Sequence, residues 1–306
     1  MKIAGLFPGQ GSQVVGMGKE LCGSDERARE IFERVDKALG ISLSSLCFEG
    51  PIEKLTLTEF AQPAILTTSI ASFACLPLPL TAGAGHSLGE YSALVAAGSL
   101  LLEDAVCIVH KRGRYMQEAV KPGMGKMVAV MGPKEEEIAS TLSSIDTGIA
   151  EIANLNCPGQ TVIAGDVAGI DLASEKLKEN GAKIIPLMVS APFHCSLMKP
   201  AAEKLWADLD RTTFKCPAFP IYANVTAKAV TSASEARELL KRQVCAPVRW
   251  TESMSQMIAD CRIDITVEFG PGGVLTKLLK RIDKNPTSYQ AFDPESISAV
   301  SNALVG

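Results

Sequence analysis

Paired cysteines are absent from this chain. Its 306 residues include nine cysteines, an odd number, and no two of them form a C-x-x-C pair. Zinc sites and disulfide frameworks normally show close pairs or even counts, so neither is expected here. We therefore predict reduced thiols, a cytoplasmic location and no bound metal.

An excess of charge of either sign is also lacking. Thirty basic side chains stand against 34 acidic ones, which gives a net charge of −4. Binding to nucleic acid or to an anionic membrane normally needs an excess of basic residues. Neither is therefore an expected partner. Hydrophobic residues make up 47% of the chain and charged residues 21%, which predicts a packed core.

The longest uncharged stretch, residues 60–85, does not have the composition of a membrane span. Pro63, Pro77, Pro79 and several polar residues interrupt it, whereas a spanning helix needs about 20 predominantly apolar residues in a row. The pattern favours a buried helix followed by a turn and a strand. Residues 1–5 predict the opening of a strand and no signal peptide.

What the chain does contain is Gly85-x-Ser87-x-Gly89, the pattern of a nucleophile elbow. Such an elbow turns a strand sharply into a helix, and glycines on both sides avoid Cβ clashes at the turn. The serine hydroxyl then stands clear of the backbone near a helix N-terminus, which favours developing negative charge. The alternative is a tight turn with an incidental serine.

Histidine, the usual base for a serine nucleophile, is scarce: there are three. His86 adjoins Ser87, and an extended backbone would point the two side chains apart. His110 falls on the polar side of a predicted helix, residues 103–120. His194 follows a proline in a loop downstream of the serine, where α/β-hydrolase-like chains place their histidine. We predict His194 as the base, the alternative being a loop histidine bonded to the main chain.

Arg112 falls within the apolar stripe of the same predicted helix. Ala105, Ile108, Val109 and Met116 share its face at a period of 3.6 residues. An arginine that faces inward is costly unless a carboxylate or phosphate meets it. Arg112 is therefore either an anion receptor for a substrate or half of an internal salt bridge.

The order of predicted elements indicates an α/β fold with an insertion. Residues 127–187 alternate as βαββαβ, the order of a ferredoxin-like unit, after a break at Lys121-Pro122-Gly123. We predict a large α/β-hydrolase-like domain in two parts, residues 1–122 and 190–306, with a ferredoxin-like subdomain at 123–189 between them.

Beyond the elbow, the chain resembles the malonyl-CoA:acyl-carrier-protein transacylases of bacterial fatty-acid synthesis, members of the acyltransferase family. The matching motifs occur in the order of that family and span nearly the whole chain. They are Phe7-Pro8-Gly9-Gln10-Gly11-Ser12-Gln13, Gly85-His86-Ser87-Leu88-Gly89-Glu90-Tyr91, Arg112-Gly113-x-x-Met116-Gln117, Asn156-x-Pro158-Gly159-Gln160, His194-Cys195-x-x-Met198, Gln243-x-x-x-Pro247-Val248-x-Trp250 and Glu268-x-Gly270-Pro271-Gly272.

The resemblance assigns roles to residues that the sequence alone leaves open. It implies that Ser87 accepts the acyl group and that His194 is its base. It further implies that Arg112 holds the malonyl carboxylate. Main-chain N–H groups of Gln10 and Leu88 would form the oxyanion hole.

The resemblance also implies two further roles. The main-chain carbonyl of Gln243 would orient His194 in place of an acid. Phe193 would line the acyl pocket, since acyltransferase domains with phenylalanine there tend to take malonyl and not methylmalonyl units.

The activity that follows is transfer of a malonyl group from malonyl-CoA to the phosphopantetheine thiol of holo acyl carrier protein, through a malonyl-serine ester. No metal or bound cofactor is implied, and we expect a monomer. The alternatives are an acyltransferase of a polyketide pathway, a serine thioesterase, or a carrier-protein docking module without activity.

Overall fold

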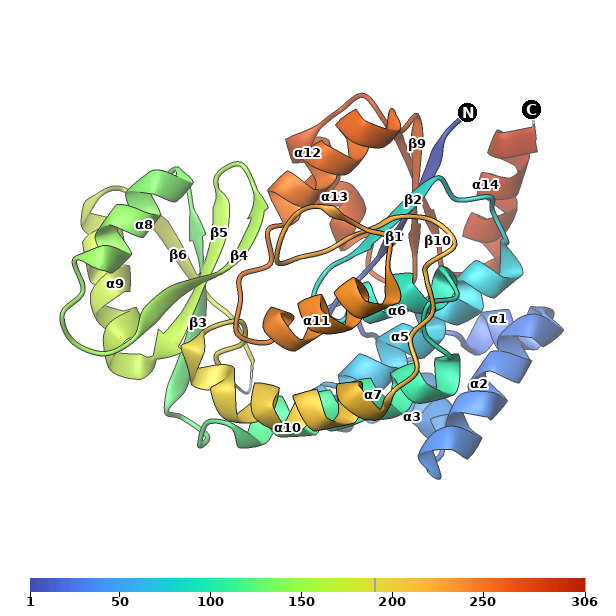
Figure 1. Ribbon diagram of the computed structural model, residues 1–306, viewed down its shortest axis with the longest axis horizontal. Coiled ribbons are helices and arrows are strands. Elements are labelled where there is room, and N and C mark those ends of the chain that lie inside the picture. The colour runs from blue at the N-terminus through green and yellow to red at the C-terminus, as the bar shows by residue number, and fades with distance from the viewer. Residues whose placement is uncertain (190, 306) are drawn as a thin grey trace.

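The computed structural model describes residues 1–189 and 191–305. The predicted domain boundary at residue 190 and the last residue, Gly306, lie outside these ranges. The described chain forms a large body around one sheet and a smaller lobe around another (Figure 1).

The large sheet has six strands in the order β10-β9-β1-β2-β7-β8. Its first five strands run parallel, and only β8 is antiparallel to its neighbour. Their bounds are β1 Ile3–Phe7, β2 Ala82–Gly85, β7 Ile221–Tyr222, β8 Ala229–Val230, β9 Ile265–Phe269 and β10 Thr287–Ala291. This is the α/β architecture predicted from the sequence. Strands β8 and β10 were not predicted.

Helices cover both faces of the large sheet because alternate residues of its strands point to opposite sides. Ile3 and Phe7 of β1 pack in the core on one side, whereas Ala4 and Leu6 pack on the other. The first side carries α5 Thr58–Cys75 and α6 Gly89–Ala96, and the second carries α12 Trp250–Cys261 and α13 Val274–Ile282.

The remaining helices of the large body surround these layers (Figure 1). Among them, α7 corresponds to the helix predicted at residues 103–120, whereas α11 and α12 were not predicted. Their bounds are α1 Lys19–Ser24, α2 Glu26–Leu39, α3 Leu43–Glu49, α4 Ile52–Leu55, α7 Leu102–Glu118, the short 3₁₀ helix η1 Ser196–Met198, α10 Lys199–Arg211, α11 Ala233–Gln243 and α14 Pro294–Val305.

The smaller lobe has an antiparallel sheet in the order β4-β5-β3-β6 and follows the predicted βαββαβ order. Its elements are β3 Gly125–Met131, α8 Glu135–Ser143, β4 Ala150–Cys157, β5 Gln160–Asp166, α9 Val167–Glu179 and β6 Lys183–Pro186. One face of this sheet packs against α8 and α9. Met127 and Ala129, on the other face, join the core of the large body.

A main-chain connection fixes the lobe to the large body. Val248 accepts a hydrogen bond from Leu155 N–H and donates one to Ala153 O, both at 2.9 Å. Because these bonds continue the edge of β4, the small sheet is held in a fixed position beside the elbow.

The uncharged stretch forms α5 and the turn before β2, as predicted. Most residues of α5 are buried on all sides, including Gln62 and Thr68. No helix within residues 1–189 and 191–305 is long and apolar enough to cross a membrane. All nine cysteines, which lie in the described part of the chain, are free thiols.

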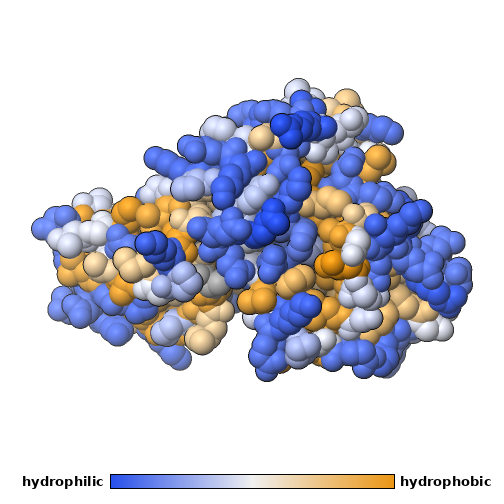
Figure 2. Space-filling view, turned by 90° about the horizontal axis from the view of Figure 1, so that it is seen from below, coloured by the Kyte–Doolittle hydropathy of each residue, from blue (hydrophilic) through white to orange (hydrophobic). Residues whose placement is uncertain are grey.

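The underside of the molecule carries apolar side chains on both the lobe and the large body, and an indentation separates the two at its lower edge (Figure 2). Exposed apolar residues also occur where the lobe joins the body. Met124 precedes β3 and is 60% exposed, and Met188 follows β6 and is 95% exposed.

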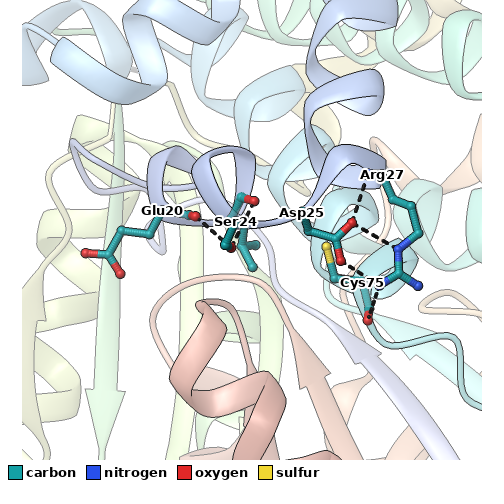
Figure 3. A network of polar contacts seen from close by, with 6 residues as sticks. Glu20, Ser24, Asp25, Arg27 and Cys75 are labelled. Carbon is teal, nitrogen blue, oxygen red and sulfur yellow. Dashed lines mark hydrogen bonds and ion pairs between the residues drawn. The ribbon is translucent and has the colours of Figure 1, made fainter.

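Asp25 and Arg27 join the start of α2 to the end of α5 in a polar network (Figure 3). The Asp25 carboxylate caps α2 by accepting Arg27 N–H at 2.9 Å and also bonds the Arg27 guanidinium at 2.5 and 3.0 Å. Arg27 in turn donates to the main-chain oxygen of Cys75 at 3.2 Å. The hydrogen bonds from Arg27 hold the pKa of Asp25 at about 2.

We expect this network to add a small stabilisation that depends on pH. Asp25→Ala should lower the free energy of unfolding by about 1 kcal/mol, the usual cost of losing an N-cap. Asp25→Asn keeps the cap, and because the Arg27 side chain is 52% exposed, losing the ion pair should cost well under about 1 kcal/mol.

The pKa of Asp25 lies below its ordinary value of 3.8. The difference between wild type and Asp25→Asn should therefore persist above that value and disappear as the pH falls toward about 2. Urea titrations across this pH range measure it, and a difference undiminished at about pH 2 would contradict the assignment.

Candidate active site

The elbow predicted at Ser87 lies between β2, which ends at Gly85, and α6, which begins at Gly89. Ser87 has a φ of 53°, a left-handed conformation that non-glycine residues rarely adopt. A Cβ on Gly85 would lie 1.9 Å from main-chain atoms of Gly89. The glycines therefore permit the close crossing of strand and helix that exposes the serine.

His194 lies against the serine hydroxyl. Its Nε2 is 2.7 Å from Ser87 Oγ, and its Nδ1 is 3.0 Å from Gln243 O and 3.2 Å from Ala246 O. Because both carbonyls can only accept, Nδ1 carries the proton and Nε2 is free to accept the Ser87 proton. Burial, and then the nearby charge of Arg112, lower the pKa of His194 to about 3. The imidazole is therefore neutral at physiological pH.

Arg112 projects from α7 to the other side of the same hydroxyl. Its guanidinium donates to Ser87 Oγ at 3.1 Å, Gln62 Oε1 at 2.8 Å and Gln243 Oε1 at 3.0 Å. The side chain is 1% exposed, and its Nε has no hydrogen-bond partner in the described part of the chain. The salt bridge that the sequence left open as an alternative does not occur among residues 1–189 and 191–305.

The loop that carries Gln10 packs directly on the elbow. A Cβ on Gly9 would lie 2.4 Å from His86 O, so only glycine lets the loop approach this closely. Gln10 and Leu88 consequently line the same cavity as Ser87. The structure thus brings together the two residues that the resemblance pairs as an oxyanion hole.

This cavity has a volume of about 160 Å³ and lies between the large body and the lobe. Met127 of the small sheet and Phe193 form part of its apolar wall, and the exposed Met188 lies at its rim. Phe193 is 7% exposed, so it is a buried part of this wall.

The other two histidines lie away from the serine hydroxyl. His86 Nε2 is 2.8 Å from Asn156 Oδ1 on β4, and His110 Nδ1 is 2.8 Å from Glu59 O. Asn156 and Cys157 are the last two residues of β4.

Comparison with known proteins identifies the family. The model of the acyl transferase domain matches residues 6–297. The chain belongs to the acyl transferase family.

Its relatives narrow the resemblance further. The malonyl CoA-acyl carrier protein transacylase of Bacillus subtilis is 48% identical over 99% of this chain and 97% of its own length. The solved structure of the transacylase of the same name from Coxiella burnetii is 39% identical and has a TM-score of 0.96. The match covers 100% of this chain and 98% of that one.

A third match is a malonyl-transacylase solved in complex with a type II PKS acyl-carrier protein. It is 39% identical, with a TM-score of 0.95, and the match covers 99% of this chain and all of that one. The resemblance noted in the sequence is therefore confirmed, as is the fold class.

Three further residues of this acyl transferase contact the site and were not predicted. Gln62 lies on α5, Glu90 follows the elbow on α6, and Asn224 follows β7. Asn224 carried a detectable signal, because polar residues that follow a parallel strand often belong to a site. Gln62 carried none, since it lies inside an apolar helix. Glu90 falls within the elbow motif, but its position is also that of an ordinary helix-start acid.

The described ranges contain no group of three or more His, Cys, Asp or Glu side chains that could hold a metal ion. The side chains that form hydrogen bonds with Ser87 instead include two neutral amides, Asn224 and Gln243, one imidazole and one guanidinium.

We expect His194 to work as a base at unusually low pH. A neutral aryl fluorophosphonate should label Ser87 at a rate whose acid-side midpoint lies well below 6.5, the ordinary imidazole value, because the folded pKa is about 3. His194→Ala should slow labelling by about 10²–10⁴-fold.

Mass spectrometry of the labelled peptide measures this rate, with the melting temperature at each pH as the control for folding. An acid-side midpoint at or above 6.5 would argue against the buried, neutral imidazole.

Proposed function

We propose that this chain transfers a malonyl group from malonyl-CoA to the phosphopantetheine thiol of an acyl carrier protein, through an ester on Ser87. One observation carries the proposal. The Ser87 hydroxyl lies between an unprotonated imidazole nitrogen at 2.7 Å and a buried guanidinium at 3.1 Å that has no ion-pair partner within the described residues. The first suits a nucleophile, and the second suits a substrate that brings its own carboxylate.

In the first half-reaction, Ser87 Oγ attacks the thioester carbonyl while its proton passes to His194 Nε2. Main-chain N–H groups of Gln10 and Leu88 receive the oxyanion as a tetrahedral intermediate forms. When the carbon–sulfur bond breaks, the imidazolium gives its proton to the departing thiolate. The products are malonyl-Ser87 and free coenzyme A.

The second half-reaction reverses these roles with a different thiol. The phosphopantetheine thiol of the carrier protein gives its proton to His194 and attacks the ester. The bond to Ser87 Oγ breaks, and His194 returns the proton to the serine. The imidazole thus serves as base and acid in both halves, and no further cofactor takes part.

Arg112 would supply the selectivity for malonyl groups. Its guanidinium meets a carboxylate through two parallel hydrogen bonds, which are stronger than its bonds to neutral amides. Holding the acyl chain in this way also fixes the ester and leaves less room for water. Phe193 would close the pocket against larger acyl groups.

Fatty-acid synthesis is the pathway we favour, with a cytoplasmic, monomeric enzyme. The relatives named malonyl CoA-acyl carrier protein transacylase support the reaction. The complex with a type II PKS carrier shows that a malonyl-transacylase of this fold can serve a polyketide carrier. A thioesterase would have no need of a buried cation beside its nucleophile.

The decisive experiment is to incubate the protein with malonyl-CoA and measure its intact mass. Wild type should gain one malonyl group and lose it when holo carrier protein is added. Ser87→Ala should gain none, because only the attacking hydroxyl is removed, whereas Ser140→Ala, an exposed serine on α8, should behave as wild type. A malonyl adduct on Ser87→Ala would show that another residue is acylated.

Arg112 separates this reaction from that of an ordinary serine hydrolase. Arg112→Ala should lower kcat/KM for malonyl-CoA by about 100-fold or more, the loss expected from a pair of charge-assisted hydrogen bonds. Acetyl-CoA lacks the carboxylate, so its kcat/KM should stay level or rise. Arg112→Lys should fall between, since an ammonium keeps the charge without the planar pair of donors.

Arg114→Ala, an exposed arginine on the same helix, is the matched control. Equal losses for malonyl-CoA and acetyl-CoA in Arg112→Ala would mean that Arg112 holds the fold and does not read the substrate.

A further inference from the structure

Glu90 is a buried carboxyl that the reaction described above does not use. It lies in the first turn of α6, three residues after Ser87, and is 2% exposed. Its Oε2 atom accepts two hydrogen bonds, from Asn224 N–H at 2.9 Å and from Gln243 Nε2 at 2.8 Å. One oxygen therefore holds two segments that lie more than a hundred residues further along the chain.

The bond to Gln243 determines which way that amide faces. Gln243 Nε2 donates to Glu90 and also to Ser87 O at 3.0 Å, which leaves Oε1 to accept from Arg112 at 3.0 Å. A flipped amide would turn its NH₂ group toward a guanidinium that can only donate. The acceptor on Glu90 thus keeps the Gln243 oxygen on Arg112, while the main-chain oxygen of Gln243 receives His194.

The bond to Asn224 acts on the nucleophile itself. Asn224 Oδ1 accepts Ser87 N–H at 2.7 Å, and its Nδ2 donates to Gly85 O at 2.7 Å. These two bonds hold both sides of the elbow, where Ser87 has its left-handed backbone conformation. Glu90 fixes the main chain of Asn224 and so the position of this clamp.

We propose that Glu90 is a positioning residue for acyl transfer, which sets Ser87, His194 and Arg112 in register by presenting one acceptor oxygen to Gln243 and Asn224. What matters is the position of that acceptor oxygen. Glu90 does not serve as a negative charge that neutralises Arg112. This inference rests on the proposed function in one respect, because its main assay measures malonyl transfer. The hydrogen bonds from which it is argued do not depend on that function.

The surroundings of Glu90 indicate that it serves as a hydrogen-bond acceptor and not as a negative charge opposite Arg112. Burial raises the pKa of Glu90 to about 7, so the carboxyl is not firmly ionised near neutral pH. The hydrogen bonds from Asn224 and Gln243 oppose that rise more than the charge of Arg112 does. No ion pair joins Glu90 to Arg112 among the described residues.

Two conservative substitutions distinguish the effect of the position of the acceptor oxygen from the effect of the carboxylate charge. Glu90→Gln loses the charge but can put an amide oxygen where Oε2 lies, and its NH₂ group takes the place of the other oxygen. Glu90→Asp keeps the charge but draws the carboxylate back by one methylene, away from both donors. The exposed Glu295 occupies the first turn of α14, so Glu295→Gln and Glu295→Asp are the matched controls.

We expect Glu90→Gln to keep kcat for malonyl transfer within about fivefold of wild type, since an acceptor remains for both donors. Glu90→Asp should lower kcat by about 10–100-fold, because reacting groups displaced by about 1 Å can lose 10²-fold in rate. The KM for malonyl-CoA should change less than kcat. Both Glu295 variants should match wild type.

A second readout makes the test independent of the acyl donor. An aryl fluorophosphonate labels an activated serine without any malonyl group, and its rate on Ser87 should follow the same order: wild type, then Glu90→Gln, then Glu90→Asp. Rates are taken per active molecule, counted by the label bound at completion, so that a folding defect is not mistaken for a slower site.

Five outcomes decide between these roles. Rates that are higher for Glu90→Gln than for Glu90→Asp support the positioning role. The reverse order would make Glu90 a counter-charge, and equal losses or two wild-type rates would likewise overturn the inference. If wild type takes no malonyl group but the fluorophosphonate rates keep the expected order, the proposed function fails while the role of Glu90 stands.

Discussion

Everything in this site depends on burying one guanidinium beside the elbow serine with no ion-pair partner among the residues that the structure describes. A buried charge is costly unless polar groups replace the water it has lost. Arg112 meets that requirement with the amide oxygens of Gln62 and Gln243 and with the hydroxyl of Ser87, all neutral acceptors. Neutral acceptors stabilise the cation without cancelling its charge, so Arg112 keeps the charge that the proposed binding of a substrate carboxylate needs.

That solution explains why the site is assembled from so many elements. Gln62 comes from α5, Arg112 from α7 and Gln243 from the end of α11, while His194 lies in the segment between β6 and η1. Ser87 and His194 both have positive φ values, of 53° and 60°. Such conformations persist only where surrounding contacts over-determine them. The hydrogen bonds of Asn224 to the elbow and of two carbonyls to His194 supply those contacts.

The elements and residues of this site that could be predicted from the sequence are those marked by a local pattern of residue types. Strand, turn and glycine signals placed β1, β2 and the inserted lobe, and the helical period placed Arg112 on a buried face. Ser87 and His194 followed from residue type and order, while Gln10, Leu88 and Gln243 came from family resemblance alone. Glu90 could not be found, because its partners lie 134 and 153 residues away and its own position suits an ordinary helix start.

The acidity of the attacking group bears on how the proposed malonyl ester could outlast water in such a site. The folded pKa of His194 is about 3, so the imidazole stays neutral and able to accept a proton. A thiol has a pKa near ~8.5, whereas that of water is about 15.7. A carrier thiol therefore gives up its proton far more readily than water does. The burial that lowers the pKa of His194 also leaves the charge of Arg112 unscreened, so the neutral base and the cation of the proposed mechanism both depend on the same exclusion of water.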